Sequence, residues 1–216
     1  MKIEKLNNCP KWLKEAKTEG ANVEIIDGVV HWHSGIWENG TWEGGVWHAG
    51  VWKKGVWSFG TWKKGIWRSG TWHNGVWLGG GWGSGTWKTG IWEDGTWNNG
   101  IWEDGIWNNG IWRSGDWLNG GWEKGTWVRG NWHSGTWKGG RWESGIWNNG
   151  IWVDGTWASG TWKDGTWVDG TWLKGYHWNG PWKNGVWCDG IWKGGKWIKG
   201  IWKQGLPTDV LSNYEN

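Results

Sequence analysis

The sequence contains no long apolar run, and it has few of the residues that usually fill or cross-link a protein core. Only one Phe, one Met, three Pro and two Cys occur among its 216 residues. The first residues, MKIEKLNNCPKW, lack the apolar stretch of a signal peptide, and no segment reaches the roughly 20 apolar residues that a membrane helix needs. Cys9 and Cys188 lie far apart and form no disulfide framework. We therefore expect a cytoplasmic or virion-associated protein.

An excess of charge of one sign is also missing. The chain has 23 basic and 20 acidic residues, which gives a formal net charge of +3. The two signs are mixed along the chain, so we expect no basic stripe of the kind that nucleic-acid-binding proteins carry. The surface is not strongly acidic either. Nucleic acid is therefore not an expected partner.

The sequence is instead dominated by 36 Trp and 44 Gly. From His31 to Gly205 it divides without insertion into 35 pentads. Gly closes every pentad, and Trp holds the second position in all but one, where His177 takes this position and Trp178 follows. Self-similarity at a fixed period is the signature of a repeat architecture.

Each pentad combines a short strand with a turn. The first position is Thr in 11 pentads, Ile in 10 and Val in 5, and all three residues favour strands. The fourth position is rich in Asn, Asp, Ser, Lys and Gly, and the invariant Gly follows, which is turn chemistry. A flat meander of such strands would leave a wall of indoles in water, whereas a solenoid buries them. We therefore predict an all-β fold, a β-solenoid with a ladder of Trp in its interior and turn carbonyls that accept the indole N–H groups.

The repeat resembles that of the pentapeptide-repeat proteins. In that family a small residue, a polar residue and a large central apolar residue recur, and here Gly95, Thr96 and Trp97 occupy the same frame. The match in period extends from His31 to Gly205 and so covers most of the chain, although Trp replaces Leu or Phe and Gly replaces Ala. The resemblance implies a right-handed, four-sided β-helix with about four pentads per coil. Such a rod would be roughly 40 Å long.

Four pentads per coil would stack residues that are 20 positions apart. In the set of pentads that begins at Ile36, positions three and four carry three formal charges in 18 places, whereas in the set that begins at Thr41 they carry twelve. Because interfaces deplete charge and favour aromatic anchors, the first set predicts an uncharged stripe that binds a protein or a second copy. Its candidate interaction residues are Phe59, Leu78, Leu118, Tyr176, Trp178 and Ile198.

Caps are expected at both ends, because an open solenoid end exposes core and unpaired strand. For residues 1–30 we predict a short helix that Pro10 opens, that Asn8 or Cys9 caps and that ends near Gly20, followed by a hairpin in NVEIIDGVVHW around its Asp-Gly turn. Residues 31–205 form the solenoid. Residues 206–216 are the predicted C-terminal tail or cap.

The chain shows no constellation of catalytic residues, and we expect neither an enzyme nor a cofactor. A period of 20 places His33, His73 and His133 on one side, but two or three coils apart, which is too far for one metal ion. The acidic residues form no buried pair for acid–base chemistry. In the irregular pentad we expect His177 to point inward and Trp178 to point outward.

These observations favour a non-enzymatic structural or adhesion rod that docks on another protein through the stripe or its ends, as in virion or tail attachments. One alternative is a regulator of a DNA-processing enzyme, as the resemblance implies, although such regulators rely on an acidic surface. Another is an ice- or carbohydrate-binding solenoid. For that alternative a period of 20 predicts an uninterrupted array of Val46, Ile66, Thr86, Ile106, Thr126, Ile146, Thr166 and Val186.

Overall fold

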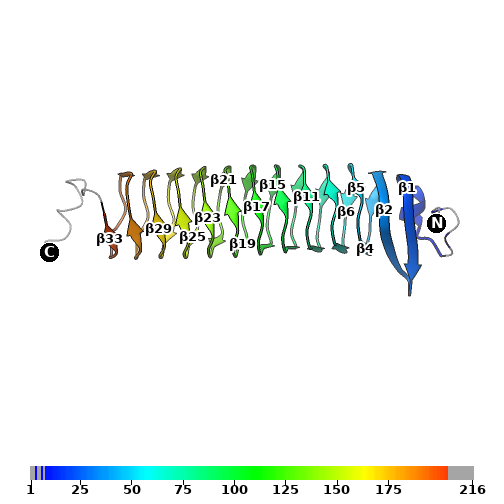
Figure 1. The fold of residues 1–216 in the computed structure, drawn as a ribbon. Coiled ribbons are helices and arrows are strands. Elements are labelled where there is room, and N and C mark those ends of the chain that lie inside the picture. Colours follow the sequence, from blue (N-terminus) through cyan, green and yellow to red (C-terminus); the bar gives the residue numbers. More distant parts are fainter. Residues whose placement is uncertain (1–2, 4–5, 7, 204–216) are drawn as a thin grey trace.

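The protein is a straight parallel β-solenoid with a helix and a hairpin at its N-terminal end (Figure 1). The computed structural model describes residues 3, 6 and 8–203. The predicted all-β solenoid is confirmed over this part of the chain. The predicted tail, residues 206–216, lies outside the described residues.

Each coil contains three pentads, so the expected four is wrong. Trp32 pairs in parallel with Trp47, and the same register of 15 continues to Trp187 and Trp202. The rod thus has three sides, and one of them is a sheet of 11 strands. At about 4.8 Å per coil its repeats span roughly 55 Å rather than 40 Å.

We call the three sides A, B and C, after the pentads that begin at His31, Ile36 and Thr41 and recur in the register of 15. The strands of side A are β4 (Val46–Trp47), β7 (Thr61–Trp62), β10 (Val76–Trp77), β13 (Ile91–Trp92), β16 (Ile106–Trp107), β19 (Gly121–Trp122), β22 (Thr136–Trp137), β25 (Ile151–Trp152) and β28 (Thr166–Trp167). Trp182 and Trp197 continue this side through isolated bridges.

Sides B and C are built in the same way. Side B consists of β5 (Val51–Trp52), β8 (Ile66–Trp67), β11 (Gly81–Trp82), β14 (Thr96–Trp97), β17 (Ile111–Trp112), β20 (Thr126–Trp127), β23 (Arg141–Trp142), β26 (Thr156–Trp157), β29 (Thr171–Trp172), β31 (Val186–Trp187) and β33 (Ile201–Trp202). Side C consists of β3 (Thr41–Trp42), β6 (Val56–Trp57), β9 (Thr71–Trp72), β12 (Thr86–Trp87), β15 (Ile101–Trp102), β18 (Asp116–Trp117), β21 (Asn131–Trp132), β24 (Ile146–Trp147), β27 (Thr161–Trp162), β30 (Tyr176–His177) and β32 (Ile191–Trp192).

The N-terminal end is closed by α1 (Lys11–Glu15) and a hairpin of β1 (Lys17–Ile26) and β2 (Val29–Asn39). The predicted Asp27–Gly28 turn is present, and both of its residues have positive φ, as a two-residue hairpin loop requires. β2 begins sides A and B, and β1 pairs antiparallel with its free edge. The Trp12 ring packs against Trp42 with centroids 5.0 Å apart, so it covers the end of the indole ladder.

The predicted helix boundaries are wrong in two respects. The helix ends at Glu15 rather than near Gly20, because the chain from Lys17 onward pairs with β2. Pro10 itself stands at the N-cap, and no side chain caps the helix. Pairing along the hairpin therefore overrides the helical spacing of the apolar residues.

The interior is a continuous stack of indoles. Trp97 stacks on Trp112 of the next coil with centroids 4.8 Å apart and planes 6° apart, and it meets Trp102 of the neighbouring side edge-to-face at 6.0 Å and 73°. Both are favoured aromatic geometries. Each Trp from Trp32 to Trp182 at the second pentad position is fully buried. Because each indole reaches the indole of the next side, three of them close the cross-section, and no fourth side is needed.

The invariant Gly forms the corner between two sides. At Gly115 φ is +122°, and an added Cβ would lie 2.3 Å from the carbonyl oxygen of Gly100 in the preceding coil. Both the positive φ and the close backbone approach exclude any side chain. By contrast, Gly121 stands at the first pentad position, and a Cβ there would meet nothing within 4 Å.

Hydrogen bonds between coils repeat as regularly as the residues do. For example, the N–H of Asn108 donates to the carbonyl of Trp92, and the N–H of Ile111 donates to that of Gly95. At some corners of the described chain the N–H of the Gly is bonded locally, because the Oδ1 of the preceding Asn or Asp accepts this N–H. This occurs at Asn74, Asp94, Asp104, Asn149, Asp154, Asp164, Asp169 and Asp189.

The expected indole hydrogen bonds form in only a minority of the pentads. Four indoles donate to the carbonyl of the fourth residue in the stacked pentad of the next coil, as Trp67 does to Ser84 at 3.2 Å and Trp162 to Asn179 at 3.1 Å. Most other buried indole N–H groups have no hydrogen-bond partner among the described residues. Stacking and burial, rather than indole hydrogen bonds, therefore account for the order of the interior.

Candidate functional site

The described interior is filled by indoles, so a binding site has to lie on the outside. One surface hollow has a volume of about 510 Å³ and is lined by six residues of side B. Within residues 3, 6 and 8–203, no three His, Cys, Asp or Glu side chains are grouped so that they could hold a metal ion. Cys9 and Cys188 are both free thiols.

The six candidate interaction residues are all exposed, but they do not form one stripe. Phe59, Leu118, Tyr176 and Trp178 lie on side C, whereas Leu78 and Ile198 lie on side A. The period of 20 predicted a single line because it assumed four pentads per coil. The register of 15 separates the set, since the numbers of Leu78 and Leu118 do not differ by a multiple of 15.

Side C collects the exposed aromatic side chains of the repeats. Phe59 is 60% exposed and Trp178 is 52% exposed, and Tyr176 lies in the same pentad as Trp178. Leu118 lies four coils from each of these two pentads, which is about 19 Å at 4.8 Å per coil. Side C therefore presents three evenly spaced apolar anchors along roughly 38 Å.

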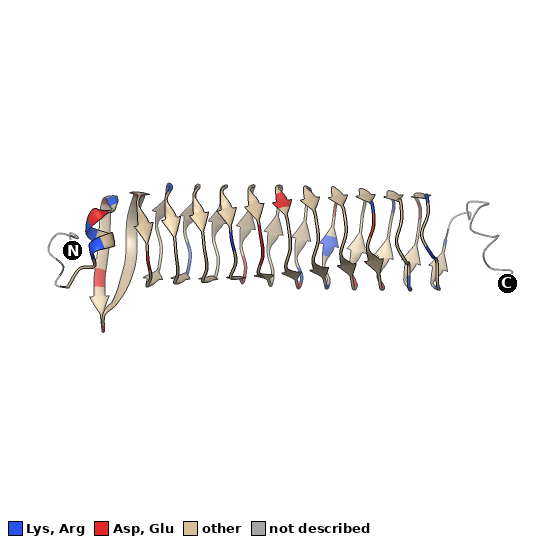
Figure 2. Cartoon of the chain, turned by 180° about the vertical axis from the view of Figure 1, so that it is seen from behind, with Lys and Arg blue, Asp and Glu red and all other residues tan. Residues whose placement is uncertain are grey.

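Side B carries all four Arg residues of the protein, Arg68, Arg113, Arg129 and Arg141. Over residues 31–203 side B has eight basic and three acidic residues. Side C has three basic and five acidic residues, and side A has seven basic and five acidic residues. Both signs occur along the whole rod (Figure 2), and the expectation of no basic stripe is wrong for side B. The register of 15 gathers cations that the linear sequence mixes with acids.

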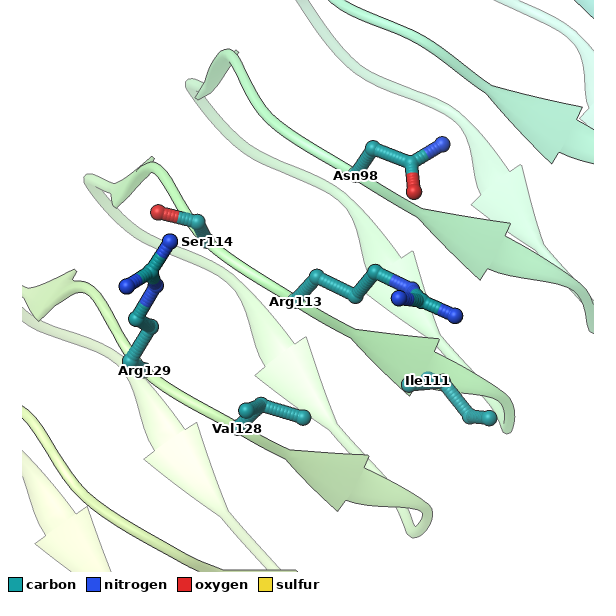
Figure 3. A pocket seen from close by; sticks show the side chains of 6 residues that line it. All are labelled: Asn98, Ile111, Arg113, Ser114, Val128 and Arg129. Carbon is teal, nitrogen blue, oxygen red and sulfur yellow. The ribbon is translucent and has the colours of Figure 1, made fainter.

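The hollow on side B lies among these arginines. Asn98, Arg113 and Val128 come from successive coils, and the Arg113 guanidinium extends away from Arg129, whose own guanidinium lies beside Ser114 (Figure 3). Arg113 and Arg129 form no ion pair within the described chain. The Asn98 amide is already committed, because it donates to the carbonyl of Trp82 at 2.8 Å. The hollow is therefore part of a broad basic side and not a converging anion site.

The pentad Tyr176–Gly180 behaves as the sequence predicted. His177 is fully buried in the place of a Trp, and Trp178 points outward. Burial lowers the pKa of His177 to about 3, and the backbone of Gly194 opposes this shift only in part. Neither ring nitrogen has a hydrogen-bond partner within the described chain. The imidazole lies between the rings of Trp162 and Trp192, with centroids 5.9 Å and 4.0 Å away.

The array that favoured ice or carbohydrate binding does not form. Its members fall on side A (Val46, Ile106, Thr166), side B (Ile66, Thr126, Val186) and side C (Thr86, Ile146). In the register of 15, Gly, Arg, Asp, Asn or Pro interrupts the first position of every side. The reason for this alternative is therefore lost.

Sequence reasoning also missed a group of histidines. A period of 20 placed His33, His73 and His133 on one common side. This prediction is wrong, because His33 lies on side A whereas His73 and His133 lie on side C. In contrast, His33 and His48 stack in adjacent coils, and His31 lies beside them. The available signal was that these histidines belong to pentads three apart in the sequence.

Comparison with known proteins leaves the chain without an assigned family. No family model and no curated protein matches it. Among solved structures, a proposed acetyltransferase from Desulfovibrio desulfuricans G20 has a TM-score of 0.20 and 4% identity, over 84% of this chain and 69% of that one. The β-solenoid with Trp every five residues is consistent with a pentapeptide-repeat-like protein. No described helix is long and apolar enough to cross a membrane.

Proposed function

We propose that this protein is a structural rod that binds another protein through side C. The observation that carries the proposal is the combination of a fully packed Trp interior with exposed aromatic residues confined to one of three sides. A rod whose repeats differ only at their outward positions can hold binding groups at fixed heights along its axis. This suits attachment or spacing more than chemistry on a small molecule.

The anchors of side C have the properties of binding hot spots. Tyr and Trp are enriched at such positions because they bury large areas at low entropic cost. Phe59, Leu118 and Trp178 lie on one face with even spacing, so a partner that is straight over roughly 38 Å contacts all three. A virion or tail attachment is a setting that uses rods of this kind, and we propose it by analogy of architecture.

The test compares a side-C variant, Phe59→Lys/Leu118→Lys/Trp178→Lys, with a side-A control, Leu78→Lys/Ile198→Lys. All five side chains are exposed, and surface substitutions usually change stability by less than about 0.5 kcal/mol each. Both variants should therefore keep the circular dichroism spectrum and, within a few degrees, the melting temperature of the original protein.

Binding partners are recovered from the native source with each protein, identified by mass spectrometry, purified and titrated by biolayer interferometry. The original protein and the side-A control should bind the purified partner equally, and the side-C variant should bind at least tenfold more weakly. Equal binding by all three proteins would refute docking through side C. A loss in the side-A control alone would move the docking surface to side A.

A further inference from the structure

Three histidines gather near the N-terminal end of side A. The Nδ1 atom of His31, on β2, lies 3.2 Å from the Nε2 atom of His48, which follows β4 in the next coil. The His33 ring stacks on the His48 ring with centroids 4.6 Å apart. All three side chains are half-buried, so the packed rings leave few alternative orientations.

The contact between His31 and His48 joins two coils through one shared proton. One ring donates and the other accepts, since a neutral imidazole has one N–H and one free nitrogen. Metal–nitrogen distances of about 2.0–2.1 Å place two ligand nitrogens about 3.3 Å apart at a tetrahedral angle and about 2.9 Å apart at a right angle. The observed 3.2 Å lies between these values, so an ion can replace the proton with little movement of either ring.

The surroundings orient the imidazoles. His33 Nε2 is held by the carboxylate of Glu24 on β1 at 2.6 Å, and this fixes the ring that stacks on His48. Burial lowers the pKa of His48, and Lys63, His33 and His31 lower it further, while Glu24 opposes the shift. The contact of His33 with Glu24 and the stacking of His33 on His48 therefore keep the His48 ring in place beside His31.

We propose that His31 and His48 form a two-histidine site for a divalent late first-row transition metal, completed by water. Imidazole favours such ions, and their affinity order gives Cu²⁺ above Ni²⁺ and Zn²⁺. Two imidazole nitrogens completed by water need no third protein ligand. This is consistent with the described residues, among which no three His, Cys, Asp or Glu side chains are grouped so that they could hold an ion. When the ion binds, the proton between the two facing nitrogens moves to the other nitrogen of the ring that donated it. The accepting ring already has its N–H on the far nitrogen, so both facing nitrogens present lone pairs and no proton is released.

The ion would connect β2 to the coil that follows it. Lys63 is the third residue of the next stacked pentad, and its positive charge works against a cation at His48. The site therefore includes one feature that weakens it, and removing this charge should tighten binding. Glu24 and His33 act as positioning residues, since they orient His48 without contacting the ion.

The experiment titrates Cu²⁺, Ni²⁺, Zn²⁺ and, as a negative control, Mg²⁺ into the full-length chain without a histidine tag, by isothermal calorimetry at pH 7.5. A Cys188→Ser background removes the half-exposed thiol as a competing ligand. We expect one ion per chain, the affinity order given above, and a higher melting temperature with Ni²⁺, because an ion that binds only the folded state stabilises it.

Single variants then identify the ligands. His31→Ala and His48→Ala should each weaken binding at least tenfold and remove the thermal shift, and His33→Ala should weaken it by up to about tenfold as a supporting residue. Lys63→Gln should bind more tightly than the original chain. His73→Ala and His133→Ala, which remove solvated histidines of side C, should change nothing.

Three results would overturn the proposal. The first is the absence of saturable Cu²⁺ or Ni²⁺ binding up to millimolar concentration. The second is unchanged binding in both His31→Ala and His48→Ala. The third is a loss of binding in His33→Ala while His31→Ala still binds normally, which would contradict His31 and His48 as the ligand pair.

Discussion

Acidification should destabilise this protein, and the buried residue His177 should contribute strongly to this effect. Its imidazole is buried between Trp162 and Trp192, and burial lowers its pKa from 6.5 to about 3. In the unfolded chain the imidazole takes up a proton as the pH falls through 6.5. In the folded protein the same imidazole stays neutral until about pH 3. The unfolded state thus binds more protons in this interval, and stability must fall as the pH decreases.

The magnitude follows from these two pKa values. Between pH 7 and pH 5 the linkage relation gives a loss of about 2 kcal/mol, and the full effect is reached near pH 3. The variant His177→Trp removes the group. Tyr176 and Trp178 keep the regular ladder bonds, to Gly160 and Trp162 at 2.9 Å each, so an indole can complete the stack. The variant should also be more stable at pH 7 by roughly 1–3 kcal/mol, because no unpaired ring nitrogens remain buried.

The assay is urea unfolding of both proteins at pH 8, 7, 6 and 5, with hydrogen exchange of the coils around residue 177 as a local readout, since repeat proteins can unfold in segments. The gap between variant and original should widen by about 2 kcal/mol from pH 7 to pH 5. His48, whose pKa is also lowered, contributes equally to both proteins and cancels in the difference. A gap that stays constant over this range would refute the buried neutral imidazole.

Three further predictions concern the repeat itself. Gly115→Ala should lower the free energy of unfolding in urea by about 3 kcal/mol or more, because its Cβ meets the Gly100 carbonyl at a positive φ. The matched control Gly121→Ala should be neutral or stabilising by up to about 1 kcal/mol. Equal effects of the two substitutions would contradict the corner geometry. Tryptophan emission should be blue-shifted in the native protein and move to longer wavelength in denaturant, whereas a water-exposed spectrum at the outset would exclude the indole interior. Deleting residues 1–30 should produce end-to-end association in sedimentation experiments, because the free edge of the first coil loses β1; a stable monomer would show that this segment does not cap the rod.

The pentad and its two fixed positions could be predicted from sequence because they depend on local chemistry. Trp at the second position and Gly at the fifth require only alternation and turn geometry, and even the inversion at His177 and Trp178 follows from alternation. The hairpin around Asp27 and Gly28 was predictable for the same reason. The number of pentads per coil was not, because it depends on how far each indole reaches across the interior and on the bend at each corner Gly.

The register of 15 nevertheless left a trace in the sequence. Lys53 bonds to Glu38 at 2.8 Å and Lys138 to Glu123 at 2.9 Å, and each pair joins two stacked pentads of one side. Asn131 bonds to Asp116 at the same spacing. Over residues 31–203, charged residues 15 positions apart form four opposite-charge and two like-charge pairs, whereas those 20 apart form five and six. The balance of opposite over like pairs therefore favours 15. In this register Glu103, Glu123 and Glu143 lie on three different sides, so the like-charge stack that a period of 20 creates does not exist.

The charge census at a period of 20 was misleading because 60 is a multiple of both 15 and 20. Residues 60 or 120 positions apart, such as Leu118 and Trp178 or Leu78 and Ile198, share a side under either register. The census therefore grouped true neighbours with residues of other sides. Sorted correctly, the uncharged anchors concentrate on side C and the arginines on side B.

The fixed interior also determines how this protein can acquire a function. Positions two and five are nearly invariant, with His177 the one departure in the described repeats, since the indole fills the cross-section and a Cβ at the corner meets backbone. Only positions one, three and four vary, and each new side chain there appears at a defined height and on a defined side. Shifting a residue by three pentads moves it about 4.8 Å along the same side, whereas shifting it by one pentad moves it to the next side. Arg113 and Leu118 belong to consecutive pentads, yet one lies on the basic side and the other on the aromatic side. Each binding surface of this rod is therefore built from every third pentad. A substitution affects only the partner that binds the side to which its pentad belongs.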